Sequence, residues 1–245
     1  GCGAELDEAV DGTLGDMGVE GTVVAGAVVA GSFSGSCESG YAWVIGSAKY
    51  GTSPGFCVEQ DEHASSSPEG TNITQGEAKL VCQALGNNYH LISENEWLTI
   101  ADNAIQVVVN DIDQLTENLQ LMTWASTSVA TSTIVLKLSN ESQLYNIVGG
   151  KAEWTDQIIT RAGLLNPTSS DWQEYSNIED YKSLNIAPPY YYTSVNGIGR
   201  IKTGLASSSP DYLRGFVRGE NALFDLDMSH SPIEATSTIG FRCAK

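Results

Sequence analysis

The sequence predicts one mixed α+β domain with two helices, small antiparallel sheets and many long loops. Two helix-start signals, several short runs of β-forming residues, and long stretches rich in Ser, Thr, Asn, Pro and Gly indicate this class. Of the 245 residues, 41% are hydrophobic, which suffices for a packed core. We expect the domain to cover residues 37–245. Residues 1–36 are rich in Gly, Ala and Val, and we expect an N-terminal tail or coupling segment there, or alternatively a pair of edge strands.

Two capping boxes predict the two helices. In each, a hydroxyl residue stands three positions before a glutamate, so that each side chain satisfies a backbone N–H of the other residue. The pairs are Thr74 with Glu77 and Ser93 with Glu96. The first pair predicts a helix over about 75–85, which Gly86 ends at the C′ position. The second predicts a helix over about 94–110.

Short strands are expected on both sides of the helices. The runs 41–45 and 55–58 are rich in aromatic and β-branched residues. Residues 222–228 are predicted to form a strand, because every second side chain belongs to one set and the others to a second set: Ala222, Phe224, Leu226 and Met228 alternate with Leu223, Asp225 and Asp227. Residues 239–243 are predicted to form the last strand. Between helices and final strands, segments such as 165–211 are predicted to be long loops, which in compact domains are usually functional.

Charge and cysteine content narrow the function classes. The formal net charge is -18, with 30 acidic and 12 basic residues, which disfavours nucleic acid and anionic membrane surfaces as partners. No run of 18 apolar residues exists, so no membrane span is expected. The five cysteines show no CxxC spacing, and four fall inside the predicted domain, a number that suits two disulfides. The fifth cysteine, Cys2, has three alternative explanations. It is a lipid attachment site, a free thiol, or a residue beside the artificial start of a shortened chain.

An ordered series of short motifs resembles a known family. The series runs through GFCV at 55–58, EA at 77–78, YHLISENEW at 89–97, EWT at 153–155, LRG at 213–215 and IGFRCA at 239–244. It resembles the formylglycine-generating-enzyme type of the C-type lectin fold. Within that type it is most similar to the variable proteins of diversity-generating retroelements. The resemblance implies a C-type-lectin-like fold whose C-terminal region, about 190–245, presents a ligand-binding surface.

The resemblance also implies how the cysteines pair. Cys82 on the first helix and Cys243 on the last strand would form the long disulfide of lectin-like folds, which leaves Cys37 to pair with Cys57. By chain entropy, closing so long a loop contributes about 5 kcal/mol. The alternative for both pairs is buried free thiols.

An enzyme of the sulfatase-modifying type is the alternative that the resemblance raises. Its catalytic members require a reactive cysteine pair shortly before the terminal GFRC motif, and no cysteine lies between Cys82 and Cys243. The three histidines, His63, His90 and His230, have no metal-ligand spacing. We therefore expect a protein that is not an enzyme. A structural virion or surface-layer component is the third reading.

Glu153 is the one weak candidate for a metal ligand. Glu153-Trp154-Thr155 resembles the family's WEWT motif, but the preceding residues 149–152 lack the asparagine that relatives use for calcium. We expect no cofactor and a structural Glu153 bound to loop N–H groups, with calcium as the alternative.

Candidate ligand contacts concentrate near the C-terminal end. Three adjacent tyrosines follow two prolines, and tyrosine gives large contact area at low entropy cost. Further along, large, charged and polar side chains mix on the predicted strands, which suits recognition. The candidates are Tyr190, Tyr191, Tyr192, Leu213, Phe216, Val217, Arg218, Glu220, Asn221, Asp225, Asp227, Ser229 and His230. Core packing of the tyrosines and an ordinary solvated sheet face are the alternatives.

Together these features predict a ligand-binding or receptor-recognition protein at the cell surface, outside the cell or on a virion. Specificity would come from side chains displayed on a rigid, cross-linked frame. The partner would be a protein or other surface receptor that the sequence does not identify.

Overall fold

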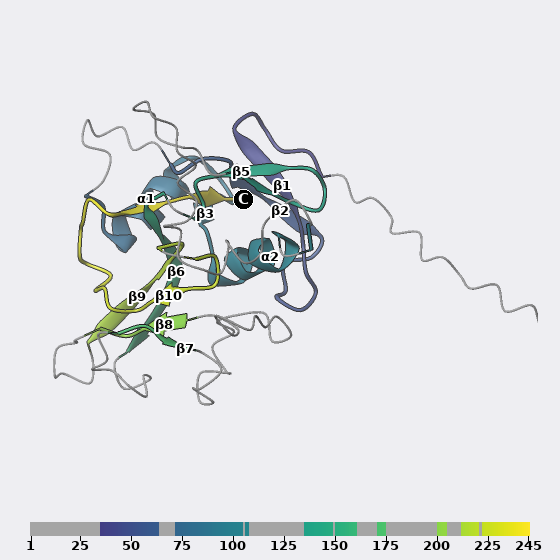
Figure 1. Cartoon of the computed structure of the whole chain (residues 1–245). Coiled ribbons are helices and arrows are strands. Elements are labelled where there is room, and N and C mark those ends of the chain that lie inside the picture. The colour runs from purple at the N-terminus through teal and green to yellow at the C-terminus, as the bar shows by residue number, and fades with distance from the viewer. Residues whose placement is uncertain are drawn as a thin grey trace, which may run out of the picture. The chain divides into compact units, whose positions relative to one another are not determined.

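A computed structural model of the chain describes residues 35–63, 72–104, 106–107, 135–148, 150–160, 171–174, 200–204, 212–220 and 222–245 (Figure 1). The predicted N-terminal segment 1–36 lies outside these residues, except for its last two. Among the candidate contacts, Tyr190, Tyr191, Tyr192 and Asn221 also lie outside them.

Two helices and twelve short strands make up the described ranges, so the predicted α+β class is confirmed. In chain order the elements are β1 (Tyr41–Ile45), β2 (Gly55–Glu59), α1 (Gln75–Ala84), β3 (His90–Leu91), α2 (Glu94–Ala104), β4 (Val135–Lys137), β5 (Gln143–Tyr145), β6 (Ala152–Thr160), β7 (Gln173–Glu174), β8 (Arg200–Lys202), β9 (Leu213–Arg218), β10 (Leu226–Asp227), β11 (Ile239–Phe241) and β12 (Cys243–Ala244).

Both predicted capping boxes are present. The Glu77 N–H donates to Thr74 Oγ1 at 3.2 Å, and the Thr74 N–H donates to Glu77 Oε2 at 2.9 Å. Ser93 and Glu96 exchange the equivalent bonds at 2.8 and 3.2 Å. Each helix therefore begins where the local signal places it. Beyond α1, Gly86 has a φ of 138°, which its C′ position favours.

The second helix ends earlier than predicted. We expected it to reach about residue 110, but α2 ends at Ala104. The N–H of Val107 donates to the carbonyl of Ala104 at 3.1 Å, which is a tighter turn than an α-helix allows. Residues 108–110 lie outside the described chain.

Three sheets form within the described ranges, in the orders β1-β2-β12-β3, β11-β6-β9-β10-β8-β7 and β4-β5. The six-stranded sheet is mixed, because β11 pairs in parallel with β6 and β10 pairs in parallel with β8. The prediction of small antiparallel sheets therefore holds for the two smaller sheets only. In the large sheet, β9 lies between β6 and β10, so strands from the C-terminal part of the described chain form its centre.

The predicted strand over 222–228 is mostly wrong. Only Leu226 and Asp227 pair as a strand, and the residues before them form turns. Every side chain from Ala222 to Met228 is buried, so the alternation in the sequence separates no inner face from an outer one. The carbonyls of Phe224 and Asp225 accept hydrogen bonds from Arg218 rather than from a neighbouring strand.

Both predicted disulfides are confirmed. Cys82–Cys243 joins α1 to β12 across 161 residues, and Cys37–Cys57 joins the residues before β1 to β2 across 20. Around them, two fully buried tryptophans anchor the interior. Trp97 donates its indole N–H to the carbonyl of Leu223 at 3.0 Å, and Trp154 donates to the carbonyl of Ile73 at 3.1 Å. These bonds satisfy the one polar atom of each buried ring.

Candidate functional site

A buried ion pair ties α2 to the large sheet. Arg218 on β9 is fully buried and pairs with Glu94, the first residue of α2. Its Nε donates to Glu94 Oε1 at 2.9 Å, and its Nη1 reaches the carbonyls of Phe224 at 3.1 Å and Asp225 at 3.3 Å. The prediction that Arg218 faces a ligand is therefore wrong. The residue stabilises the frame.

A second buried pair explains Glu153. Both of its carboxylate oxygens accept hydrogen bonds from Arg242, at 2.7 to 3.1 Å, and neither side chain is exposed. Burial raises the pKa of Glu153, and the guanidinium opposes this shift. The expected partner, backbone N–H groups of a loop, is replaced by an arginine. Because a positive group already occupies both oxygens, the site does not fit a calcium ion.

Several predicted ligand contacts lie in the interior instead. Their exposed fractions are 1% for Phe216, 1% for Val217, 0% for Arg218, 2% for Asp225 and 0% for Asp227. The expectation that these five face solvent is wrong. From Arg214 to Arg218, β9 is buried on both faces of the sheet, whereas a half-solvated strand would bury only one.

Four other candidates remain at the surface to different degrees. Leu213 is 45% exposed and Glu220 is exposed, while Ser229 and His230 are half-buried. The structure brings Glu220, Ser229 and His230 together around the buried carboxylate of Asp227, and it adds Lys202, which the sequence did not single out. We call Lys202, Glu220, Asp227, Ser229 and His230 the Asp227 cluster.

Strand pairing builds this cluster. Asp227 and Lys202 are register partners on the parallel strands β10 and β8, and Lys202 Nζ lies 3.0 Å from Asp227 Oδ2. The Ser229 N–H donates to Asp227 Oδ1 at 2.6 Å. Gly204, with a φ of 67°, lets the chain after β8 pass close to Ser229, because a Cβ at this position would collide with that side chain.

The histidine of the cluster lies between carboxylates. His230 Nε2 is 3.6 Å from Asp227 Oδ2, and Nδ1 is 3.3 Å from Glu234 Oε2, an ion pair without hydrogen-bond geometry. Burial lowers the pKa of His230, but the contacts with Asp227 and Glu234 together outweigh this, and the pKa is raised. Because both ring nitrogens face carboxylates, the imidazole has no nitrogen directed at a substrate. This arrangement suits a charged contact surface better than a general base.

The carboxylates of the cluster differ from one another. Burial would raise the pKa of Asp227, but contacts with the side chains of His230, Ser229 and Lys202 hold it below its ordinary value. Burial and the neighbouring Asp227 raise the pKa of Glu220, which lies 3.9 Å from Lys202 Nζ. Asp227 thus acts as a fixed, buried anion that positions Lys202 and His230 toward the surface.

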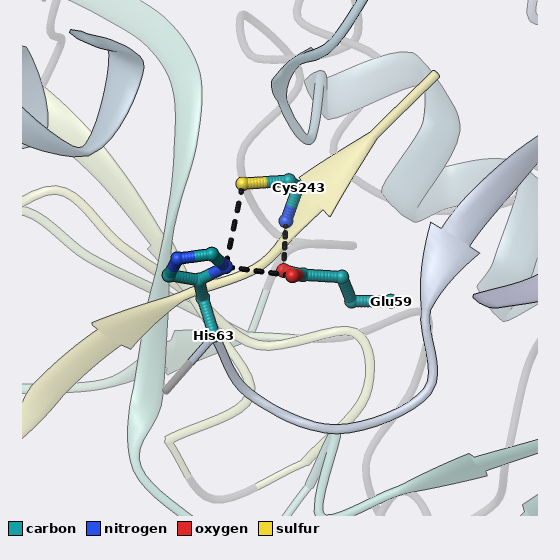
Figure 2. Close-up of side chains that lie close together, drawn as sticks. All are labelled: Glu59, His63 and Cys243. Carbon is teal, nitrogen blue, oxygen red and sulfur yellow. Dashed lines mark hydrogen bonds and ion pairs between the residues drawn. The ribbon is translucent and has the colours of Figure 1, made fainter. Parts of the chain in front are cut away.

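A second cluster joins residues that lie far apart in the sequence. Figure 2 shows Glu59 at the end of β2, His63 just after it and Cys243 on β12 with their side chains directed toward one another. His63 Nδ1 lies 2.6 Å from Glu59 Oε1 and 3.8 Å from Cys243 Sγ. The sequence shows no metal-ligand spacing around His63, because 180 residues separate it from the cysteine.

A pocket of about 350 Å³ lies elsewhere, at the start of α2. Its walls include Tyr50, Thr52, Ser93, Asn95, Glu96 and Lys245. The Glu96 carboxylate in this wall already accepts bonds from Ser93 and His90. None of the candidate ligand contacts lines it.

Comparison of the chain with known protein families, with characterised proteins and with solved structures gives no match. Within the described residues, neither helix has the length and apolar character needed to cross a bilayer.

Proposed function

We propose that this chain is a ligand-recognition protein that displays chemically varied side chains on a rigid, lectin-like frame. The observation that carries the proposal is the Asp227 cluster. There, a buried carboxylate holds a lysine and a histidine beside an exposed glutamate, all within the region that the sequence resemblance assigns to binding. The proposed binding surface keeps its expected location. Of the expected contacts it retains Glu220, Ser229 and His230, it adds Lys202, and it has Asp227 buried beneath them.

The frame beneath the cluster supports this function. Two disulfides and two buried arginine–glutamate pairs hold this frame together without using the exposed side chains. They join α1 to β12, the residues before β1 to β2, α2 to β9, and β6 to the residue between β11 and β12. Recognition requires such pre-organisation, because ordering a mobile surface costs free energy and so weakens its affinity for the ligand. Lys202 and His230 are held in place from below, and their outer atoms remain partly accessible, with 24% and 23% of each side chain exposed.

A catalytic function that uses a cysteine thiol has less support than a binding function. All four cysteines of the described residues are joined in disulfides, so none presents a free thiolate on this frame. Both ion pairs of His230, with Asp227 and with Glu234, lie in the predicted binding region, which favours charge recognition there.

Binding is tested with a fixed panel of immobilised purified extracellular receptor domains and glycans. The labelled full chain is compared with the double variant Glu220→Ala, His230→Ala. We expect the variant to lose affinity for any panel member that the chain binds by about tenfold or more, since central contacts contribute about 2 kcal/mol or more each.

The matched control carries Glu141→Ala and His90→Ala, which remove the same two residue types outside the cluster. Glu141 and His90 are exposed to 77% and 42% of their side chains. Near-ultraviolet circular dichroism confirms that all three proteins keep their fold. Equal loss in both double variants, or full binding by the cluster variant, would contradict the proposal.

The retroelement origin has a separate test in the natural variation of the gene. Among related isolates, changes should concentrate in about 190–238 and fall on exposed positions such as Glu220, sparing the buried Arg218 and Asp227. A reverse-transcriptase gene nearby, with a near-repeat of the 3′ coding segment, is the matching genomic feature. Changes spread evenly along the chain would contradict this origin.

A further inference from the structure

The Glu59, His63 and Cys243 side chains offer an oxygen, a nitrogen and a sulfur that all lie within 4.8 Å of one another. The two non-cysteine side chains are nearly enclosed, with 14% of Glu59 and 15% of His63 exposed. Cys243 is fully buried. Three different donor atoms therefore converge in a place that is sheltered from solvent.

A catalytic relay does not account for it. A base that activates a thiol uses one ring nitrogen for the thiol and the other for the group that orients the ring. Here Nδ1 of His63 faces both Glu59 Oε1 and Cys243 Sγ, so the three donor atoms point to one place between them (Figure 2). Convergence on one point is the arrangement of ligands around a metal ion, and carboxylate, imidazole and thiolate are the ligands that zinc accepts.

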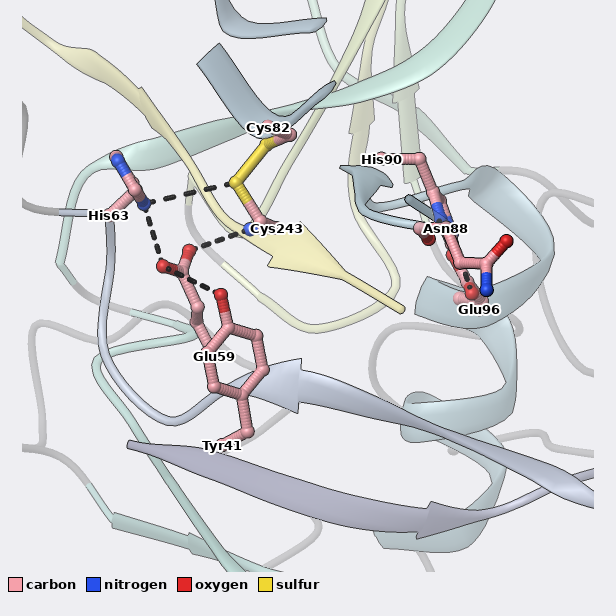
Figure 3. The surroundings of a disulfide bond; sticks show 8 residues. All are labelled: Tyr41, Glu59, His63, Cys82, Asn88, His90, Glu96 and Cys243. Carbon is pink, nitrogen blue, oxygen red and sulfur yellow. Dashed lines mark hydrogen bonds and ion pairs between the residues drawn. A yellow bond between two sulfur atoms is a disulfide. The ribbon is translucent and has the colours of Figure 1, made fainter. Parts of the chain in front are cut away.

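A candidate for the fourth ligand is Cys82, whose sulfur is bonded to that of Cys243. Figure 3 shows Cys82 on α1 bonded to Cys243 directly beside His63 and Glu59. We propose that Cys82, Cys243, His63 and Glu59 form a tetrahedral site for a zinc-class divalent cation when this disulfide is reduced, so that the metal and the disulfide are alternative cross-links at one position.

The distances suit this exchange. Ligand atoms of one tetrahedral zinc ion lie about 3.3–3.8 Å apart, given bonds of about 2.0–2.3 Å. His63 Nδ1 and Cys243 Sγ are already 3.8 Å apart. The Glu59–His63 contact of 2.6 Å must lengthen by less than about 1.5 Å, and the two sulfur atoms must separate, which rotation of the cysteine side chains allows.

The surroundings already orient the ligands. Glu59 Oε2 accepts the Cys243 backbone N–H at 2.7 Å, which leaves Oε1 directed at His63. The His63 ring stacks against Phe241 with centroids 4.8 Å apart, and its backbone N–H donates to the Phe241 carbonyl at 2.9 Å. Partners of this kind fix ligand orientation and raise metal affinity.

The redox step balances with a thiol reductant. Two reductant thiols become a disulfide, and their two electrons and two protons convert the Cys82–Cys243 bond into two thiols. The divalent cation then replaces the two thiol protons, which pass to solvent, and His63 binds through Nδ1 with its proton on Nε2.

The test titrates Co²⁺ into the full chain and then displaces it with Zn²⁺. Cys2, Cys37 and Cys57 are changed to serine, so that Cys82 and Cys243 are the remaining thiols. A phosphine reductant opens the disulfide, taking oxygen from water to become the phosphine oxide, and is removed without air. We expect thiolate-to-cobalt charge-transfer absorption and tetrahedral ligand-field bands in the reduced chain and neither in the oxidised chain.

Variants of the two other ligands decide whether the site is the proposed one. His63→Ala and Glu59→Gln should each weaken Co²⁺ binding by about tenfold or more, since even outer partners of a ligand change affinity by about 10–100-fold. His90→Ala is the matched control, because His90 forms a similar pair with Glu96 on the other side of the same view (Figure 3). It should bind cobalt as the parent does.

Three results would overturn the proposal. They are equal cobalt binding by oxidised and reduced chains, binding in the reduced chain that His63→Ala leaves unchanged, and a reduced chain that unfolds and is not refolded by Zn²⁺. The variant Cys82→Ser cannot form the disulfide and keeps the other three ligands, so it should bind cobalt more weakly and still depend on His63. Ligand binding by the Asp227 cluster is measured separately, and the failure of one proposal leaves the other standing.

Discussion

Each ring nitrogen of His90 has its own acceptor. Nδ1 lies 2.9 Å from the carbonyl of Asn88, and Nε2 lies 2.9 Å from Glu96 Oε1. The hydrogen bond to Glu96 raises the pKa of His90 to about 9, with smaller contributions in the same direction from Asn88 and Asp156 and a lowering by burial. A charged imidazolium thus joins β3 to the first turn of α2.

This pairing predicts a pH-dependent stability. In the unfolded chain His90 titrates near its ordinary value of 6.5, so its contribution is full below that pH and is lost as the pH rises through about 9. His90→Gln should therefore lower the free energy of unfolding at about pH 6 and have little effect at about pH 10. Because 42% of the side chain is exposed, solvent screening keeps the difference below about 1 kcal/mol.

Urea unfolding of both proteins at several pH values measures the difference, and groups common to both cancel. A destabilisation by His90→Gln that grows as the pH rises would show that the imidazolium does not stabilise the native state.

For some single charged residues, the predicted exposure to solvent was also wrong. Arg218 and Asp227 stand in a segment of mixed charges that suggested an outward face, yet both are fully buried. Their partners, Glu94 and Lys202, lie 124 and 25 positions away. The residues around a charged side chain do not indicate so distant a partner. When no partner is known, a charged residue is expected at the surface.

For the helices and strands, local capping signals predicted the helix starts correctly, whereas the alternation of side chains did not predict which face of a strand is exposed. The helix starts depend on residues three positions apart, so the sequence contains everything needed to predict them. A strand instead acquires its exposed face from its neighbours. Since β9 is packed on both faces, Phe216 and Val217 are both buried although they point to opposite sides.

The Arg218–Glu94 pair is the strongest test of how the elements are joined, because it connects α2, β9 and the turns before β10. Arg218→Met leaves the Glu94 carboxylate buried without its cation, and we expect it to lower the free energy of unfolding by about 3–5 kcal/mol. Chemical denaturation followed by tryptophan fluorescence gives this value.

The control for this substitution is Glu141→Gln, which removes an ion pair with Lys137 at a position where 77% of the glutamate side chain is exposed. It should change stability by less than about 1 kcal/mol. If Arg218→Met costs no more than this control, the buried pair does not hold the helix to the sheet.

For the molecule as a whole, the sequence predicted the frame better than the site. The class, both helices and both disulfides follow from local signals and from the order of motifs. The Asp227 cluster depends on the parallel pairing of β8 with β10, and the Glu59–His63–Cys243 cluster depends on β12 lying beside β2. Pairing between distant strands carries no signature within either strand, so these clusters could not be placed in advance.

The two disulfides differ chiefly in how much chain they enclose. Cys82–Cys243 spans 161 residues and encloses most of the domain, whereas Cys37–Cys57 spans 20 residues and joins the residues before β1 to β2. In the chain-entropy description, a cross-link destabilises the unfolded state more when its loop is longer. The long disulfide should therefore contribute more to the stability of the oxidised protein.

Replacing Cys82 and Cys243 together by serine should lower the free energy of unfolding by about 5 kcal/mol, against about 3 kcal/mol for the same change at Cys37 and Cys57. Urea unfolding of the two double variants beside the oxidised parent measures both values, and removing both cysteines of a pair avoids stray thiols. An equal or larger loss at the short disulfide would mean that native packing around β1 and β2, rather than the entropy of the unfolded chain, decides what each cross-link contributes. The serine variant at positions 82 and 243 should also fail to gain stability from Zn²⁺, because the two thiolates that would replace the disulfide are gone.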